Sequence, residues 1–156
     1  GKGSASYEIM QYLVKRLPVI PFPRQARNKC QPVAISDVIK YLVGVLEVPE
    51  TAGKDFDIGG RDVLTYKELL KVLAGLLDKR TIFIPFPFFN IGLYTYLASL
   101  LTPIPNSITR CLVEGLKNEA ICHDESIKKY FPFEPMSYKE AVLRTIPPEK
   151  QDNAPR

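Results

Sequence analysis

The sequence predicts a mixed α/β fold in which a few short strands are combined with a mainly helical second half. Two observations lead to this fold class. In the first half, stretches with apolar residues at helical spacing alternate with short extended stretches, and in the second half helical patterns follow one another. The chain of 156 residues, 46% hydrophobic and 24% charged, has room for one domain with a buried core, as in soluble globular proteins.

The first half carries clear signals for the ends of its elements. Thr65 and Glu68 form a capping box, and Ser36 is the expected N-cap of an earlier helix. Gly59 and Gly60 are expected to form a tight turn with positive φ. In order, we expect a helix over 4–18, an extended or loop-like stretch over 19–30, a strand over 31–35, a helix over 37–49, a strand over 54–60, a helix over 66–79 and a strand over 80–86.

The second half opens with a tract that has no charged residue between Arg80 and Arg110. Prolines break this tract, and its unbroken stretch, 88–101, is shorter than the roughly 20 residues of a membrane-spanning helix. We therefore expect a buried or cleft-covering helix, with peripheral membrane contact as the alternative. The remaining expected elements are helices over 106–117, capped by Asn106 or Ser107, over 124–131, capped by Asp124, and over 137–146, with a capping box from Ser137 to Glu140, and a short strand over 119–123.

Charge and cysteine usage argue against several classes of protein. The net charge of +4 comes from scattered basic residues, so we expect no nucleic-acid partner. The three cysteines show no C-x-x-C spacing, which disfavours a disulfide framework and a zinc site. Cys122 and His123 are neighbours without further ligands in the pattern, so we predict no metal and assign His123 no role. No signal peptide is recognisable, and the expected location is cytoplasmic.

The opening GKGSAS is similar to a dinucleotide-binding loop but does not meet its requirements. The G-x-G-x-x-G loop follows a buried strand, and Ser6 stands here at its third glycine position. A P-loop needs Lys directly after its second glycine, where this chain has Ser4. We interpret the segment as a turn that leads into the first helix, with Ser4 or Ser6 as the N-cap.

A series of short motifs runs along nearly the whole chain. They are R-L-P at 16–18, P-R at 23–24, Q-P-V-A-I-S-D-V at 31–38, E-x-P-E-T-A-G-K-x-F-D-I-G-G at 47–60 and L-T-Y-K-E-L at 64–69. In this order of motifs the chain resembles the C-terminal half of NAD(P)-binding, nucleoside-diphosphate-sugar-epimerase-like proteins. More narrowly, it is similar to the atypical branch of the extended short-chain dehydrogenases, the NmrA-like and complex-I-39-kDa-subunit-like group.

The resemblance implies the C-terminal half of a Rossmann-type fold, with residues 1–146 as a substrate-side domain and 147–156 as a polar, disordered tail. In such proteins a Gly-rich loop in an N-terminal Rossmann half binds NAD or NADP. Many members use a Tyr-x-x-x-Lys pair, in which the Lys lowers the pKa of the proton-transferring Tyr. Neither motif occurs here, since none of the eight tyrosines is followed four positions later by Lys. We predict no catalytic residue in this chain and no cofactor bound by it alone.

Four residues are candidates for contact with a substrate. The resemblance implies that Ser4 and Ser6 approach the substrate cleft, the alternative being that one of them is simply an N-cap. Arg24 presents a guanidinium that suits a phosphate or carboxylate, the alternative being an exposed loop cation. Gln31 is a candidate hydrogen-bonding partner of the substrate, the alternative being that it satisfies local backbone groups.

Other side chains have a structural explanation beside a functional one. Asp37 is expected to stabilise the N-terminus of its helix through the helix dipole. Aromatic residues of the uncharged tract are expected either to line the floor or lid of a cleft or to pack in the core. These are Phe86, Phe88, Phe89, Tyr94 and Tyr96.

These features lead to one main functional hypothesis and two alternatives. The main one is the substrate-binding and structural half of an NAD(P)-dependent epimerase- or reductase-like protein, not catalytically competent alone. The alternatives are a non-catalytic assembly module and, more weakly, a peripheral membrane protein. The expected partner is an N-terminal Rossmann half. Because the strands expected over 31–35 and 54–60 would lack neighbours, we also predict self-association, in the form of a strand-exchanged dimer.

Overall fold

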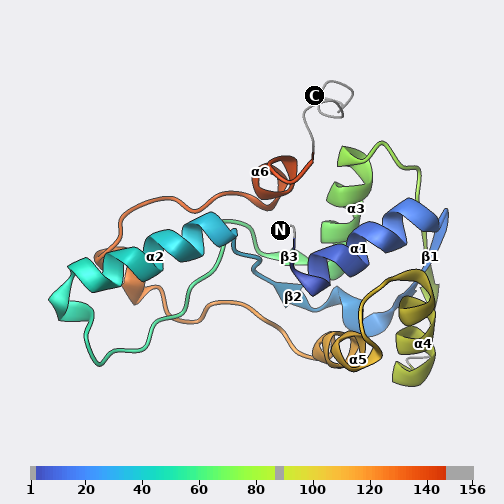
Figure 1. Cartoon of the computed structure of the whole chain (residues 1–156), viewed down its shortest axis with the longest axis horizontal. Helices are drawn as coiled ribbons and strands as arrows, with labels where there is room; N and C mark the ends of the chain where they lie inside the picture. The colour runs from blue at the N-terminus through green and yellow to red at the C-terminus, as the bar shows by residue number, and fades with distance from the viewer. Residues whose placement is uncertain (1–2, 87–89, 147–156) are drawn as a thin grey trace.

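The structure of the chain is a computed structural model that describes residues 3–86 and 90–146 and, at positions 24, 25, 86 and 91, the backbone alone. Its helices, strands and 3₁₀ turns (η) alternate along the first half, and helices dominate the second (Figure 1). In order they are α1 (Ala5–Arg16), β1 (Val19–Pro23), η1 (Arg24–Arg27), β2 (Lys29–Cys30), α2 (Ile35–Glu47), η2 (Pro49–Thr51), β3 (Leu64–Thr65), α3 (Tyr66–Leu76), β4 (Ile82–Phe86), α4 (Ile91–Leu101), α5 (Asn106–Gly115), η3 (Ser126–Lys129) and α6 (Tyr138–Leu143).

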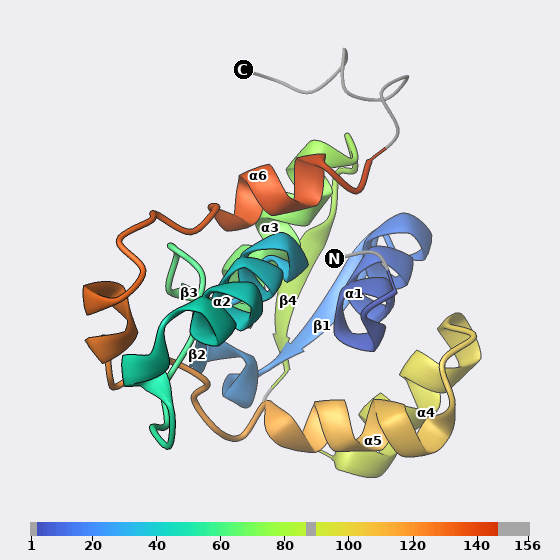
Figure 2. The same cartoon turned by 60° about the vertical axis from the view of Figure 1, so that its left-hand side comes forward.

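The strands form two small sheets. β1 and β4 are parallel, with Val19 opposite Ile82, and Figure 2 shows them side by side. β2 and β3 form a short antiparallel pair. The strand expected over 80–86 is confirmed as β4, whereas β1 lies in a stretch for which the sequence predicted only an extended or loop-like chain. Pro21 and Pro23 cannot donate to a ladder, and a two-stranded sheet tolerates them because each strand has an open edge.

Three strands expected from the sequence are wrong. The segment 31–35 has no regular structure until α2 begins at Ile35, and the segment 54–60 has none at all. The segment 119–123 is reduced to a single bridge between Ala120 and Cys30. Their alternating or apolar composition is suited to a strand. A strand also needs a neighbour that takes up its backbone hydrogen bonds. Within the described residues, such pairing of these segments is limited to Ala120, whose amide donates to the Lys29 carbonyl at 2.9 Å and whose carbonyl accepts from the Gln31 amide at 2.8 Å.

Gly59 and Gly60 are needed for a reason other than the predicted one. Among the described glycines, Gly3 and Gly53 have positive φ, whereas Gly59 and Gly60 do not. A Cβ atom at Gly60 would lie 1.9 Å from the carbonyl oxygen of Pro32. Glycine therefore allows two backbone segments to cross at a distance that any side chain would prevent.

Both predicted capping boxes are confirmed. The hydroxyl of Thr65 accepts a hydrogen bond from the Glu68 amide at 3.2 Å, and the Glu68 carboxylate accepts one from the Thr65 amide at 2.7 Å. Ser137 and Glu140 make the same two bonds at 3.2 and 2.7 Å at the start of α6. These motifs act within four residues, so the sequence is enough to predict them.

Of the other predicted caps, Ser4 holds the N-cap position of α1, whereas those predicted for α2 and α5 are wrong, although both helices exist. The N-cap of α2 is Ala34, and Ser36 lies inside the helix. The N-cap of α5 is Pro105, and neither Asn106 nor Ser107 occupies that position. Helices α2 and α5 therefore begin without a hydrogen bond from a capping side chain.

The core lies where α1, α3 and α6 pack together with β1. Leu73 of α3 is fully buried, and α3 places most of its apolar residues in this core. Tyr7 and Val14 of α1 meet Val142 of α6 in the same cluster. The remaining buried members are Ile20, Phe22, Ala26, Cys30, Leu69, Leu70, Ala74, Leu76, Tyr138 and Ile146.

The uncharged tract forms α4 as expected, and α4 packs against α5 at one end of the molecule (Figure 2). Thr95 and Ala98 are buried, whereas Leu93, Tyr96, Leu97 and Leu100 are exposed, so α4 is not a buried helix as a whole. In residues 3–86 and 90–146, no helix is both long and apolar enough to cross a membrane.

Helix α2 projects from this core together with the segments 48–60 and 121–136 (Figure 1). The helix expected over 124–131 is reduced to the single turn η3. Asp124 lies just before this turn, and its carboxylate accepts a hydrogen bond from the amide of Ser126, the first residue of η3. Apolar side chains line the outer face of α2. They are exposed at Ile35, Ile39, Leu42, Val43 and Leu46.

Candidate functional site

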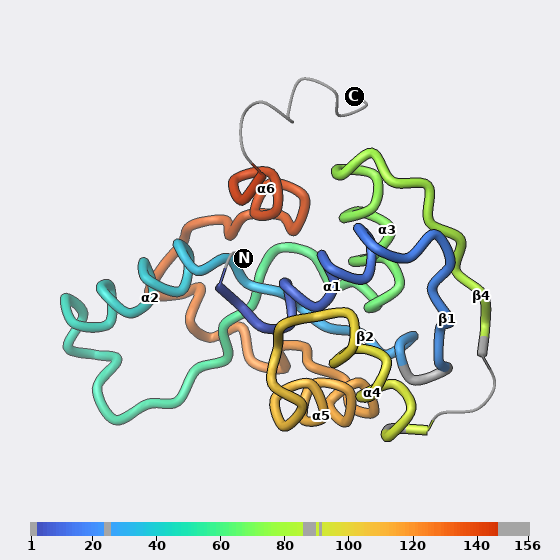
Figure 3. Tube along the Cα trace, turned by 45° about the vertical axis from the view of Figure 1, so that its right-hand side comes forward, coloured from blue at the N-terminus to red at the C-terminus, as the bar shows by residue number. Residues whose placement is uncertain are grey.

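A cavity of about 810 Å³ lies where the first turn of α1 meets the chain entering α2. Figures 1 and 3 show the beginnings of α1 and α2 side by side, with α6 above them. We call it the serine cavity because Ser4, Ser6 and Ser36 line it. The other lining residues are Tyr7, Met10, Cys30, Gln31, Pro32, Val33, Ala34, Ile35, Tyr66, Leu69, Ala120, Met136, Tyr138, Ala141, Val142, Arg144, Thr145 and Ile146.

Three of the four candidate residues predicted from the sequence line this one cavity. Ser4 holds the N-cap position of α1, but its side chain makes no capping hydrogen bond, and Ser6 lies in the first turn of the helix. Gln31 comes from a different segment. The side chain of the fourth candidate, Arg24, lies outside the described part of the structure, which gives only its backbone in η1.

The side chain of Gln31 is held by backbone groups. Its Nε2 donates to the Gly60 carbonyl at 2.8 Å, and its Oε1 accepts from the Cys122 amide at 3.0 Å. These are the bonds expected from the second of the two predicted roles, in which the Gln31 side chain forms hydrogen bonds with nearby backbone groups rather than with a substrate. They join the cavity wall to the segments 54–60 and 121–136.

Several residues of the cavity could not be found from the sequence. The hydroxyls of Tyr7 and Thr145 lie 2.6 Å apart, although the two residues come from opposite ends of the chain. Tyr138 is buried, and its hydroxyl has no hydrogen-bond partner within the described residues. These contacts depend on the packing of α1 against the end of the chain, for which no local signal exists.

The thiol of Cys30 and the phenols of Tyr138 and Tyr66 in the cavity wall stay protonated near neutral pH. Burial raises the pKa of the Cys30 thiol to about 11 and raises that of the Tyr138 phenol above its ordinary value. Burial also raises the pKa of Tyr66. A protonated phenol or thiol can donate a hydrogen bond to a bound ligand.

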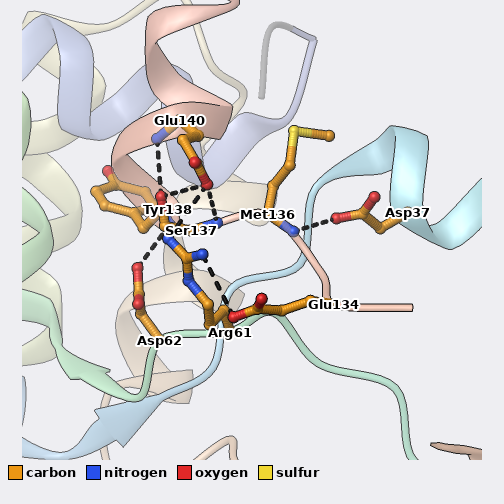
Figure 4. Close-up of polar contacts among 8 residues, drawn as sticks. All are labelled: Asp37, Arg61, Asp62, Glu134, Met136, Ser137, Tyr138 and Glu140. Carbon is orange, nitrogen blue, oxygen red and sulfur yellow. Dashed lines mark hydrogen bonds and ion pairs between the residues drawn. The ribbon is translucent and has the colours of Figure 1, made fainter. Parts of the chain in front are cut away.

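A network of carboxylates fixes the segment before α6 at the edge of the cavity (Figure 4). The carboxylate of Asp37 accepts from the Met136 amide at 2.7 Å, and that of Asp62 accepts from the Tyr138 amide at 2.8 Å. Arg61 bridges Glu134 and Glu140 at 3.4 and 3.3 Å.

Asp37 is fully buried, and burial by itself would raise its pKa. Hydrogen bonds from Lys40 Nζ, at 2.8 Å, and from the Met136 amide outweigh burial, so the pKa of Asp37 lies below its ordinary value. Asp37 therefore joins α2 to the segment before α6, beyond the helix-dipole role predicted for it.

A carboxylate occupies part of the turn before α1, where a cofactor pyrophosphate would have to bind. A phosphate needs free amides that face it at a helix start. The Gly3 amide instead donates to the Glu8 carboxylate at 3.2 Å, so a negative charge already stands at this turn. No group of three or more His, Cys, Asp or Glu side chains that could hold a metal occurs within residues 3–86 and 90–146.

The predicted aromatic lining is divided between two environments. Tyr94 is half-buried and lines a second cavity, whereas Tyr96 is exposed. Phe88, Phe89 and the side chain of Phe86 lie outside the described residues. His123 is exposed, and its backbone amide donates to Asp57.

Comparison with known proteins gives a structural relative. No protein-family model matches the chain, and no curated protein matches its sequence. A solved structure of a nucleoside-diphosphate-sugar epimerase from Staphylococcus aureus matches with a TM-score of 0.58 at 14% sequence identity. The match covers 86% of this chain and 47% of that one, so this chain spans about half the length of the epimerase. The chain thus has the mixed α/β fold of the C-terminal half of an epimerase-like protein.

Proposed function

We propose that this chain is the substrate-side half of an NAD(P)-dependent, nucleoside-diphosphate-sugar-epimerase-like or reductase-like protein, and that the serine cavity is its part of the substrate site. The observation that carries the proposal is the meeting of Ser4, Ser6 and Gln31 at one cavity. The sequence alone predicts each of these three residues as a substrate contact. The fold shared with the epimerase agrees with this assignment.

The composition of the cavity suits a ligand with hydroxyl groups and a negative charge. Ser4, Ser6 and Ser36 supply hydroxyls that both donate and accept hydrogen bonds. Arg144 is the one charged residue among the described residues that line the cavity, and no carboxylate does so. A nucleoside diphosphate sugar combines these properties, because its sugar carries hydroxyls and its diphosphate is anionic.

In this proposal the cofactor binds to an N-terminal Rossmann half, and hydride transfer needs both halves. The chain contains neither a Gly-rich phosphate loop nor a Tyr-x-x-x-Lys pair. When bound, NAD or NADP would supply the hydride acceptor or donor, while this chain binds and orients the substrate. The protonated state of Tyr138 and Cys30 agrees with a binding role.

Calorimetric titration tests the proposal. We expect NADPH and NADH to give no saturable heat with the chain, and UDP-glucose to bind. Ser4→Trp should abolish UDP-glucose binding, because Ser4 makes no capping bond and an indole there would fill the cavity. Ser107→Trp, at an exposed serine in the first turn of α5, is the matched control. Saturable NADPH binding, or equal UDP-glucose binding by both variants, would refute the proposal.

The outer face of α2 favours a second candidate role, that of an interface, which both the main hypothesis and the assembly-module alternative include. Five large apolar side chains lie exposed on this one helix, although monomeric soluble proteins rarely expose large contiguous apolar patches. We propose that the Rossmann half covers this face in a longer protein, and that the isolated chain associates with itself through it. The predicted strand exchange loses its basis, because the segments 31–35 and 54–60 form no strands.

Light scattering at increasing protein concentration checks this second candidate. We expect the isolated chain to associate, and Leu42→Ser with Leu46→Ser to restore a monomer, since both side chains are exposed on α2. A chain that stays monomeric at millimolar concentration would contradict it.

A further inference from the structure

A second cavity, of about 380 Å³, lies between α1, β1 and the α4–α5 pair. Leu13, Phe22, Leu70, Leu97, Ala98 and Leu112 are among the residues that line it. None of its described lining residues is charged, and the hydroxyls on its wall belong to Ser6, Tyr66 and Tyr94. We call it the apolar cavity.

The apolar cavity is partly open to solvent and large enough to hold a ligand. Small-molecule sites are concave, mostly apolar clefts with a few polar groups. A dry cavity of about 150 Å³ lined by Leu, Ile and Phe is already enough to bind benzene. A cavity of about 380 Å³ therefore has room for a larger apolar group.

The two cavities share part of their walls. Ser6, Met10 and Tyr66 line both the serine cavity and the apolar cavity. The two cavities are therefore neighbours, and a molecule that spans the shared wall would place a polar part among Ser4, Ser6 and Ser36 and an apolar part against Leu13 and Ala98. The junction itself carries the hydroxyls of Ser6 and Tyr66, which suit the point where a polar group joins an apolar one.

We propose that the substrate of this protein is amphipathic, with an aliphatic or aromatic group in the apolar cavity and a polar group in the serine cavity. The proposal rests on the proposed function in that it takes the serine cavity as the substrate site. A sugar or a nucleotide does not suit the apolar cavity, because its hydroxyls and amides would lose hydrogen bonds to water there without replacement. An alkyl or aryl group gains free energy in proportion to the apolar area that it buries.

Alkyl glucosides of increasing chain length test the proposal, titrated calorimetrically below their critical micelle concentrations. The glucose group is constant in this series, and only the apolar part changes. We expect hexyl, heptyl and octyl glucoside to bind progressively tighter, by about fourfold for each methylene that the cavity buries. Equal affinity across the series would overturn the proposal.

A pair of variants shows whether the apolar cavity is where the chain binds. Ala98→Leu places a larger side chain in the cavity, and we expect it to abolish the dependence of affinity on chain length. Ser99→Leu changes the next residue of α4, which does not line the cavity, and should keep that dependence. An unchanged dependence in Ala98→Leu, with native circular dichroism, would overturn the proposal. The series on the unmodified chain remains a test if Ala98→Leu does not fold.

The experiments separate this inference from the proposed function. If affinity is independent of chain length while UDP-glucose binds and Ser4→Trp abolishes its binding, the amphipathic substrate is refuted and the proposed function stands. If Ala98→Leu removes the dependence on chain length while UDP-glucose does not bind, the apolar cavity is supported as a ligand site and the nucleotide-sugar assignment falls.

Discussion

Helices α3 and α2 have similar lengths, 11 and 13 residues, and both carry an apolar face, yet the protein uses the two faces in opposite ways. The apolar side chains of α3 are buried against α1, α6 and β1. Most large apolar side chains of α2 are exposed, and its buried residues are Asp37 and Tyr41. An amphipathic pattern therefore predicts a helix with an apolar face, but not what covers that face.

Different forces hold the two helices in place. Burial of apolar area holds α3. Helix α2 is held by the Asp37 carboxylate on the Met136 amide and by tilted and edge-to-face ring contacts, with Tyr41 4.7 Å from Phe133 and 6.2 Å from Phe131 between ring centroids. We therefore expect the loss of an apolar side chain to destabilise the protein most when it lies in α3. The loss of a polar side chain should destabilise it most when it lies in α2.

The largest expected effect is at the centre of α3. Leu73→Ala should lower the free energy of unfolding by about 2–5 kcal/mol, because Leu73 is fully buried and its removal leaves a cavity. Leu42→Ala on the outer face of α2 is the matched control, with an expected change within about 0.5 kcal/mol. Urea unfolding measures both, at a protein concentration low enough for the chain to be monomeric. A large loss at Leu42 would contradict the comparison by showing that the outer face of α2 is covered within the monomer.

The next largest effect is expected at the polar attachment of α2. Asp37→Asn should cost about 1.5–3 kcal/mol at pH 7, because it removes the charge from hydrogen bonds with Lys40 and Met136 in a buried position. Chemical denaturation of both proteins gives the difference. A loss below about 0.5 kcal/mol would show that the aromatic contacts alone fix α2.

Acid should reduce this difference between wild type and Asp37→Asn. Folding lowers the pKa of Asp37 below its ordinary value of 3.8, so the folded state favours the carboxylate. This contribution to stability is present above the ordinary pKa and is lost as the pH falls through the folded pKa. Unfolding curves between pH 7 and pH 2 should therefore converge for the two proteins. A gap that widens in acid would contradict the assigned direction.

A close backbone crossing joins the two regions, and Gly60→Ala tests it. We expect a loss of about 1–3 kcal/mol, because the added Cβ would lie 1.9 Å from the Pro32 carbonyl oxygen and the backbone would have to move. Gly75→Ala is the control, since a Cβ there meets nothing in the exposed part of α3. That variant should gain about 0.5–1 kcal/mol from better helix propensity. Thermal unfolding distinguishes the two signs.

The smallest expected effect compares a serine that caps with one that does not. Ser137→Ala should cost about 1 kcal/mol, because it removes the capping box of α6. Ser36→Ala, inside the first turn of α2, should change stability by less than about 0.5 kcal/mol. An equal loss at the two positions in urea unfolding would show that Ser36 caps α2 in solution.

The sequence by itself determined the features that act over a few residues. The helix periodicities and the capping boxes at Thr65 and Ser137 depend on neighbours within one turn, so their local pattern is sufficient. It also directed attention to Ser4, Ser6 and Gln31, because the resemblance placed their motifs near a substrate cleft.

Tertiary structure alone decided which extended segments became strands and what each apolar face contacts. The segments 31–35 and 54–60 look like strands but have no ladder partner in the described chain, while β1 pairs with β4 from more than sixty positions away. Likewise, the bond between Tyr7 and Thr145 and the wall shared by the two cavities join distant parts of the chain. Such contacts depend on how all the elements pack at once, and residue patterns within a single segment do not encode them.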